Sequence, residues 1–178
     1  MTKEELQERF EFRNVKAEEA DQAIEIENIC FPPNEACSPK SMTERVSRAQ
    51  ETFLVAVDKE TGKIAGFLNG IATDEEAFRD EFFTDIRLHN IKGKNIMILG
   101  LDVLPEYRGQ GLAREIMERY LKLRKKTLKL DALHMYDLYC PMVDEVSYDI
   151  DFETQTKALE LVNLDTDTVV YTKNADQK

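Results

Sequence analysis

The sequence predicts an α/β (α+β) fold, in a single domain over residues 1–178, with a mixed central β-sheet flanked by helices on both faces. The chain has 178 residues, of which 42% are hydrophobic and 33% are charged, as expected for one globular core. Its hydrophobic pattern alternates between helical spacing and short apolar runs. The strongest run, residues 95–104, is apolar on both faces, so we expect it in the centre of the sheet between two covering layers.

The first elements follow from the spacing of apolar residues. Residues 9–16 alternate weakly and predict a first strand, and residues 17–30 carry apolar residues at helical spacing up to a pair of prolines. A proline-rich loop follows this helix. Ser38 or Ser41 then caps a second helix, which we expect to run to about residue 51.

Residues 53–58 and 64–73 are predicted to pair as a β-hairpin. Both segments are rich in aliphatic residues, and the turn between them contains Gly62. The acidic, phenylalanine-rich stretch over residues 74–85 predicts a short helix that leads toward the central strand.

After the central strand, the pattern predicts one long helix and three further strands. The helix begins at Leu112, buries one face, and ends in a basic turn at residues 124–126, where cations complement the helix dipole. Residues 131–140 predict a strand. Residues 157–164 and 168–172 predict a second hairpin.

The charge balance limits the classes of partner. Lys and Arg total 24 and Asp and Glu total 35, which gives a net charge of −11 and a pI of about 4.8. Nucleic-acid binding needs a basic surface, whereas an acidic surface attracts cationic ligands such as amines. We therefore expect a small-molecule amine as the partner and no nucleic acid. The oligomeric state is left open, a homodimer included.

The three cysteines, Cys30, Cys37 and Cys140, stand far apart and form no CxxC pair. Their spacing predicts reduced thiols in a cytoplasmic protein, with no disulfide framework and no metal site. The charged N-terminus lacks the apolar core of a signal peptide, and no run approaches the roughly 20 apolar residues that span a bilayer. We expect no membrane contact.

The segment over residues 100–114 carries the clearest chemistry. The central strand enters a loop that contains Arg108, Gly109, Gln110 and Gly111, and a helix follows at once. Backbone N–H groups of such a loop and of the first helical turn point the same way, and the helix dipole adds positive charge. This arrangement fits a pyrophosphate, and the alternative is an ordinary tight strand-to-helix loop.

These residues also match a family signature. The pattern R-x-x-G-x-G/A, after a strand that ends in L-x-V, is present as Leu101, Val103, Arg108, Gly111 and Ala113. On this pattern the chain resembles the GNAT superfamily of N-acetyltransferases. More narrowly, it resembles the serotonin (arylalkylamine) N-acetyltransferase-like branch in four stretches: residues 31–39, residues 73–76, residues 101–114, and Leu138-Tyr139-Cys140 with Tyr148 ten residues after Leu138.

The resemblance implies acetyl-CoA as the co-substrate. The backbone of Leu101 and Val103 would pair with the pantetheine arm as an added strand does, and the following loop would bind the pyrophosphate. The cofactor-binding residues that the resemblance implies are Leu101, Asp102, Val103, Arg108, Gly109, Gln110, Gly111, Leu112, Ala113 and Arg114.

The resemblance also implies a catalytic group and a substrate site. Tyr148 would protonate the departing CoA thiolate as general acid, while a backbone N–H of the central strand polarises the acetyl carbonyl. Phe31 and Pro39 match positions that contact the amine. Met97 and Leu99 stand where serotonin acetyltransferases carry two histidines as a proton path, and neither can accept a proton. The base is left open between water relayed to carboxylates and a substrate that arrives as the free amine.

Other side chains compete for these roles. Tyr139 is the second candidate acid, but it lies within a predicted strand. Cys140 has no evident base beside it, so direct attack is favoured over a ping-pong route. His134 is expected to be structural, and His89 is expected to be solvated in a polar loop.

The residues and the resemblance together predict an enzyme that moves the acetyl group from acetyl-CoA to a primary amine, a small (aryl)alkylamine, by direct attack. Two alternatives stay open. One is an acetyl-CoA-binding module without turnover, suggested by Met97 and Leu99. The other is an acetyltransferase that acts on a peptide or protein amine.

Overall fold

Five strands form one sheet in the spatial order β1-β2-β3-β4-β5 in the computed structural model, which describes residues 1–127, 132–135, 159–163 and 168–173. Neighbouring strands are antiparallel from β1 to β4, whereas β4 and β5 are parallel, so the sheet is mixed as predicted. The strands are β1 Phe10–Asn14, β2 Phe53–Asp58, β3 Ile64–Thr73, β4 Asn95–Val103 and β5 Ala132–Met135. A separate antiparallel hairpin, as predicted, joins β6 Leu159–Asn163 and β7 Thr168–Lys173.

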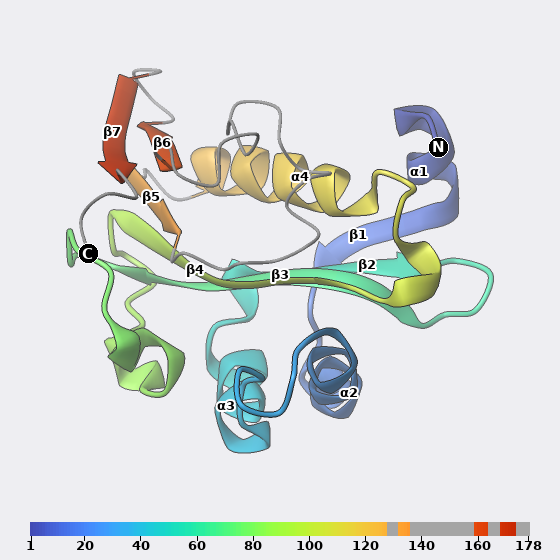
Figure 1. Ribbon diagram of the computed structural model, residues 1–178, viewed down its shortest axis with the longest axis horizontal. Helices are drawn as coiled ribbons and strands as arrows, with labels where there is room; N and C mark the ends of the chain where they lie inside the picture. Colours follow the sequence, from blue (N-terminus) through green and yellow to red (C-terminus); the bar gives the residue numbers. More distant parts are fainter. Residues whose placement is uncertain (128–131, 136–158, 164–167, 174–178) are drawn as a thin grey trace.

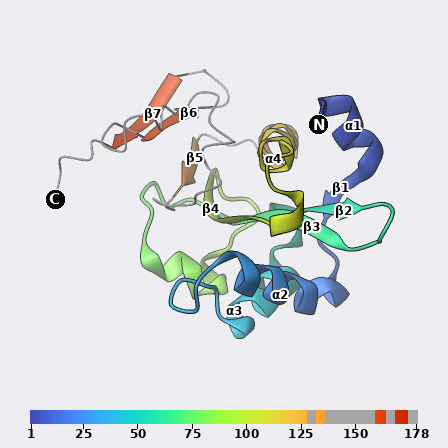
Figure 2. The ribbon, with the colours of Figure 1, turned by 45° about the vertical axis from the view of Figure 1, so that its right-hand side comes forward.

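Helices cover both faces of the five-stranded sheet (Figure 1). Helix α4 lies along one face, with α1 on the same side, and α2 and α3 lie on the other face; Figure 2 shows these layers from another side. The α-helices are α1 Lys3–Arg9, α2 Ala20–Cys30, α3 Pro39–Arg48 and α4 Leu112–Thr127. Short 3₁₀ turns are η1 Ala17–Glu19, η2 Gln50–Thr52, η3 Asp80–Phe83, η4 Ile86–Leu88 and η5 Pro105–Tyr107.

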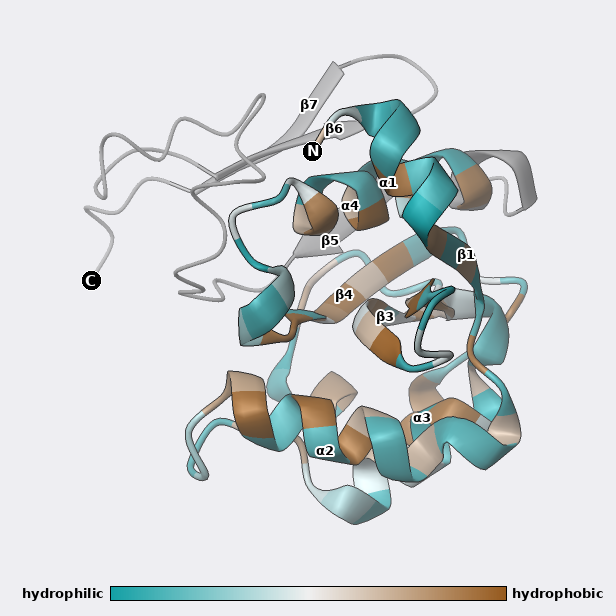
Figure 3. Ribbon diagram, turned by 90° about the vertical axis from the view of Figure 1, so that its right-hand side faces the viewer, coloured by the Kyte–Doolittle hydropathy of each residue, from teal (hydrophilic) through white to brown (hydrophobic). Residues whose placement is uncertain are grey.

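Apolar side chains fill the space on each side of the sheet. Toward α4 the core contains Ile98 and Ile116, and toward α2 and α3 it contains Ile26, Met42 and Phe67. Figure 3 shows hydrophobic residues along β4 in the middle layer, and polar residues interspersed along the covering helices. Residues 95–103 form β4, which lies between two covering layers as predicted, but β3 and not β4 is the middle strand of the sheet. In the part of the chain that the structure describes, no helix has the length and hydrophobicity to cross a membrane.

The predicted cap of the second helix is confirmed at Ser38, whose Oγ accepts a hydrogen bond from the Ser41 backbone N–H at 3.1 Å. The helix ends at Arg48, earlier than expected, and a 3₁₀ turn follows. The helix predicted over residues 17–30 also starts later than expected. Residues 17–19 form a 3₁₀ turn, and α2 begins at Ala20.

The short helix expected over residues 74–85 is wrong for most of that stretch. Helical turns begin at Asp80, and they are 3₁₀ turns. The earlier residues bond instead to the segment that precedes β4. Asp74 accepts hydrogen bonds from Asn90 and Lys94, and the Glu75 carbonyl accepts one from Asn95.

Candidate active site

A tight loop joins β4 to α4, and two glycines give it its shape. Gly109 and Gly111 have φ values of 70° and 84°, in the left-handed region that residues with a Cβ rarely adopt. The Glu115 N–H donates to the Gly111 carbonyl at 3.1 Å as α4 begins. The N–H groups of residues 112–114 therefore precede the helical ladder, at the positive end of the helix dipole. This is the geometry expected of an anion site.

Two polar side chains hold this loop in place. Arg108 donates from Nε to the Val103 carbonyl at 2.9 Å, and Gln110 donates from Nε2 to the Glu106 carbonyl at 3.0 Å. One donor of Arg108 thus folds the loop back onto β4. Arg108 therefore positions the loop in addition to supplying the positive charge that the sequence indicated.

Helix α1, which the sequence reasoning missed, lies against the same loop. The N-terminal ammonium donates to the Gln110 carbonyl at 3.3 Å, and Leu6 lies 3.8 Å from the point that a Cβ of Gly111 would occupy. A capping box begins this helix, in which Thr2 and Glu5 accept from each other's backbone N–H. This T-x-x-E pattern is the sequence signal that identifies the helix.

Strand β4 contains one extra residue relative to β3. Asn69 lies opposite Gly100 and Gly70 lies opposite Ile98, so Leu99 has no partner in the register. A bulge of this kind bends the strand and moves the side chains beyond it to the other face of the sheet.

The bulge decides which side chains of β4 face α4. Ile98 packs in the core toward α4, and so do Leu101 and Val103, although a regular strand would point residues at these odd spacings away. Asp102 consequently faces α2 and α3. Its side chain, expected among the cofactor-binding groups, therefore lies on the face opposite to α4.

The edge of β4 changes at the same place. Strand β5 pairs with β4 from Asn95–Ala132 to Ile98–Met135. Beyond Ile98, residues 99–103 have no strand beside them on that edge within the described ranges. A strand-like ligand would bond to this stretch, which contains the two residues predicted to pair with a pantetheine arm.

A group of polar side chains is buried between β3, β4 and the helices α2 and α3. This buried polar cluster consists of Glu27, Arg45, Asn69 and Asp102, none of which is more than 6% exposed. Arg45 donates from Nη1 to Oδ1 of Asn69 at 3.0 Å, and the backbone N–H of Cys37 donates to Oε1 of Glu27 at 2.8 Å.

Four atoms of the buried polar cluster lack a hydrogen-bond partner among the described residues: Glu27 Oε2, Asn69 Nδ2, and both carboxyl oxygens of Asp102. Three of them converge over Gly100, which has no side chain. The point that a Cβ of Gly100 would occupy is 3.0 Å from Asn69 Nδ2, 3.3 Å from Asp102 Oδ2 and 4.0 Å from Glu27 Oε2. A buried polar atom without a partner costs roughly 1–3 kcal/mol. A proton, a water molecule or a ligand at this point would provide these atoms with a hydrogen-bond partner.

Burial raises the pKa of both carboxyls. For Asp102, burial and then the negative charge of Glu27 raise the pKa well above its ordinary value, against the opposing effects of the Cys30 thiol, Arg45 and Arg108. For Glu27, burial raises the pKa more than a backbone N–H and the charge of Arg45 lower it. Both shifts favour the uncharged form of the carboxyl.

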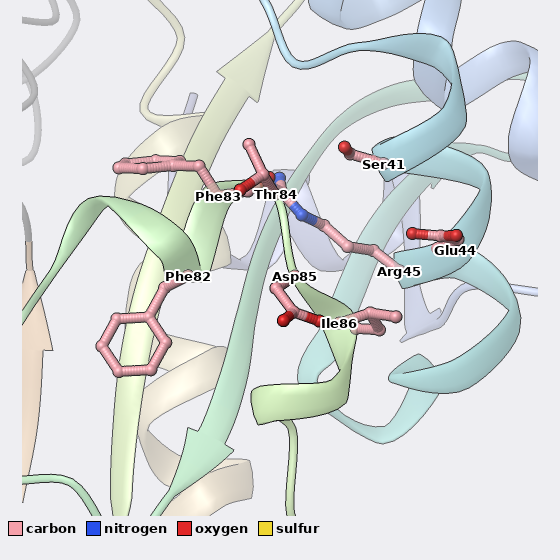
Figure 4. A pocket seen from close by; sticks show the side chains of 8 residues that line it. All are labelled: Ser41, Glu44, Arg45, Phe82, Phe83, Thr84, Asp85 and Ile86. Atoms are coloured by element: carbon pink, nitrogen blue, oxygen red, sulfur yellow. The ribbon is translucent and has the colours of Figure 1, made fainter.

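Arg45 also reaches a small hollow between α3 and residues 82–86. Its Nη2 donates to the Phe83 carbonyl at 2.6 Å, and Figure 4 shows its side chain directed from α3 toward Phe83 and Thr84. The hollow is lined by Ser41, Glu44, Arg45, Phe82, Phe83, Thr84, Asp85 and Ile86. One guanidinium thus connects this hollow with Asn69 of the buried polar cluster.

Comparison with known families decides the assignment of this fold. Residues 20–138 match the Acetyltransferase (GNAT) family. The chain belongs to the GNAT family. The superfamily predicted from the motif at Leu101–Ala113 is therefore confirmed, while the serotonin acetyltransferase-like branch stays a prediction.

Solved GNAT structures share the fold. The loading GNATL domain of CurA from Lyngbya majuscula is similar with a TM-score of 0.63 and 18% identity, over 71% of this chain and 63% of that one. The GphF GNAT-like decarboxylase, in complex with isobutyryl-CoA, is similar with a TM-score of 0.62 and 19% identity, over 70% and 64% of the two chains. At these identities the likeness establishes the fold alone.

A curated protein also matches part of the sequence. The oligopeptidase PepF from Bacillus subtilis (strain 168) is 32% identical over 81 residues, which are 42% of this chain and 12% of that protein. The chain therefore spans less than two thirds of the length of each of these three relatives.

Within the GNAT fold, the expected substrate residues lie in different places. Met97 and Leu99 pack with Phe82 in an apolar cluster beneath residues 80–88, where they are 0% and 4% exposed. Phe31 caps the end of α2, and Pro39 is the first residue of α3. In its described part, the structure does not bring these four residues into one cluster.

The prediction that His89 is solvated is wrong. Its side chain is 8% exposed, its Nδ1 accepts from the Ala72 N–H at 3.1 Å, and its Nε2 contacts Glu51 at 2.5 Å. Because Nδ1 accepts, the ring proton lies on Nε2 and points to Glu51, so His89 joins the end of β3 to η2.

Several predicted groups lie outside the described residues, namely Tyr139, Cys140 and Tyr148. His134 lies on β5. Within the described ranges, no three or more metal-ligating side chains form a group.

Proposed function

We propose that this GNAT protein transfers the acetyl group of acetyl-CoA to a primary amine. The proposal rests on two features that follow each other along one segment. The first is the edge of β4 over residues 99–103, and the second is the glycine loop at 109–111. An extended pantetheine arm fits the first feature, and a pyrophosphate fits the second. The isobutyryl-CoA held by GphF supports a CoA thioester as a ligand of this fold.

Each part of the segment has a distinct task in this proposal. The backbone of Leu101 and Val103 holds the pantetheine arm, and residues 108–114 hold the pyrophosphate. A backbone N–H at the bulge polarises the acetyl carbonyl as its oxygen becomes negative. The amine nitrogen attacks the carbonyl carbon, the C–S bond breaks, and Tyr148 protonates the leaving thiolate.

We infer that the acceptor is a small alkylamine with an aromatic or other apolar group. The net charge of −11 favours a cationic substrate over an acidic one. Phe31 is half-buried and Pro39 is exposed at the two ends of the loop between α2 and α3, where they offer apolar contacts near the protein surface.

The first test is acetyl-CoA-dependent thiol release across arylalkylamines, polyamines, aminoglycosides and lysine peptides. Turnover that is fastest with arylalkylamines is the expected result. A preference for lysine peptides would assign a peptide or protein amine instead, and tight acetyl-CoA binding with no turnover would favour a binding module.

A separate assay of CO₂ release addresses a decarboxylase, the activity named for GphF, because decarboxylation leaves the thioester intact and frees no thiol. If the protein released CO₂ from a carboxylated acyl-CoA without any amine, decarboxylation would replace acetyl transfer as the assigned activity. A failure to bind CoA, measured by calorimetry, would overturn the interpretation of residues 99–114.

A further inference from the structure

The buried polar cluster lies beside the segment of β4 to which we assign the thioester. Gly100 follows the bulge at Leu99, and the partnerless oxygens of Glu27 and Asp102 converge over Gly100. The two carboxyls approach from different elements, since Glu27 is on α2 and Asp102 is on β4. Neither carboxyl has a role in the acetyl transfer outlined above.

The charges around this pair are unequal. Arg45 from α3 is the cation buried with it, and Arg108 at the surface adds a weaker attraction. Burial raises the pKa of Cys30 to about 12 and also raises the pKa of Cys37, so both neighbouring thiols are uncharged at neutral pH. Two carboxylates would leave an excess negative charge in the core. One bound proton removes that excess.

We propose that the Glu27–Asp102 pair accepts the proton that the substrate ammonium must lose before it attacks. An ammonium ion has no lone pair, so the transfer is obligatory for an amine that arrives charged. The proposal rests on the proposed acetyl transfer. It supplies the proton acceptor that Met97 and Leu99 cannot provide.

The proton balance closes without any further reactant. The pair begins with one proton and one negative charge, and it takes a proton from R–NH₃⁺ directly or through one water. The neutral amine then forms the new C–N bond, and the C–S bond breaks. The second nitrogen proton replaces the proton that Tyr148, the proposed acid, gives to the thiolate. The pair returns its extra proton to solvent before the next turnover.

The neutral variants Asp102→Asn and Glu27→Gln test the pair. Each should lower kcat by roughly 100-fold or more, as expected for loss of a positioned base, while CoA binding is retained. Glu25→Gln changes an exposed carboxylate on the same helix and should behave like the wild type. Wild-type kcat in both pair variants would overturn the proposal.

A second readout separates proton transfer from a merely structural role. The loss of kcat in both variants should become smaller as the pKa of the amine substrate falls. A weakly basic amine already carries its lone pair at neutral pH and needs no proton acceptor. The acid limb of the kcat/KM profile should also move in the variants. A defect that is equal for strongly and weakly basic amines would overturn the proposal.

Infrared spectroscopy tests, without turnover, whether one carboxyl of the pair is protonated. The wild type at pH 7 should show the carbonyl stretch of a protonated carboxyl, and Asp102→Asn should lose or shift it. Absence of this band overturns the acceptor proposal even when acetylation proceeds. Conversely, a wild type that shows the band but acetylates no amine overturns the proposed acetyl transfer, and the acceptor role falls with it.

Discussion

Arg45 and Asn69 form a buried hydrogen bond between α3 and β3, with Nη1 of the arginine 3.0 Å from Oδ1 of the asparagine. The same guanidinium donates to the Phe83 carbonyl, so it is fixed from two sides. Its charge is held near Glu27 and Asp102 without a direct ion pair to either in the described part of the chain. The bond therefore makes Arg45 the fixed positive charge of the buried polar cluster.

Removal of that charge should destabilise the fold. Arg45→Met keeps an apolar stem but removes the charged hydrogen bonds to Asn69 and Phe83 and the cation near the buried carboxyls, and each such hydrogen bond contributes about 1.5–3 kcal/mol. Urea unfolding followed by circular dichroism measures the loss. Arg48→Met, at the exposed end of the same helix, is the control and should change the free energy of unfolding little. Equal effects of the two variants would contradict a special role for Arg45.

Stability should fall with rising pH because of Asp102. Its pKa is higher in the folded protein than in the unfolded chain, so the native state binds more protons. The resulting penalty is absent below about pH 4, the pKa of an unfolded aspartate, and grows as pH rises toward the folded pKa. The free energy of unfolding of the wild type relative to Asp102→Asn should therefore decrease between pH 5 and pH 8.

Asp58 provides a control of opposite sign for that experiment. Burial tends to raise its pKa, but hydrogen bonds from the Glu60 N–H, Tyr107 and Arg9 lower it overall. Its stabilising contribution is thus complete above about pH 4 and is lost in acid. The difference between the wild type and Asp58→Asn should stay constant from pH 5 to pH 8, and a constant difference for Asp102→Asn as well would refute the pKa shift.

Gly111→Ala should weaken CoA binding. A Cβ at its positive φ costs about 1–2 kcal/mol of strain and distorts the loop that we assign to the pyrophosphate. We expect calorimetry to show a rise in the Kd for CoA of roughly tenfold, which corresponds to about 1.4 kcal/mol. Gly62→Ala introduces the same strain at φ 69° in the β2–β3 turn, outside the residues that we assign to CoA, and should leave that Kd unchanged.

Leu99→Ala should reduce stability more than it changes substrate preference. Leu99 is 4% exposed within the apolar cluster beneath residues 80–88, so truncation leaves a cavity and costs about 2–5 kcal/mol. The matched control is Ile91→Ala, at a residue 44% exposed, which should cost far less. Thermal unfolding combined with KM values for several amines distinguishes this result from a direct contact between Leu99 and the amine.

The sequence was informative wherever a local pattern determines the structure. The first hairpin, the cap at Ser38 and the long helix from Leu112 all follow from apolar spacing and turn chemistry that lie within a few residues of each element. The GNAT signature around Arg108 and Gly111 is equally local, and the family match confirms it.

Features that depend on residues distant in the sequence could not be predicted in this way. Glu27, Arg45, Asn69 and Asp102 are separated by tens of residues, and nothing in their immediate neighbours indicates that they meet. The bulge at Leu99 is hidden for a different reason. Residues on both sides of it are apolar, so a change of face leaves no break in the hydrophobic pattern.

The bulge makes the register of β4 a functional property. If the same residues paired with β3 without the bulge, Leu99 would lie opposite Asn69, and the two faces of the strand beyond that point would be exchanged. Asp102 would then enter the apolar layer beneath α4, and Val103 would replace it opposite Glu27. A one-residue shift in the register of β4, with every functional side chain retained, would thus remove Asp102 from the face of the sheet where Glu27 lies.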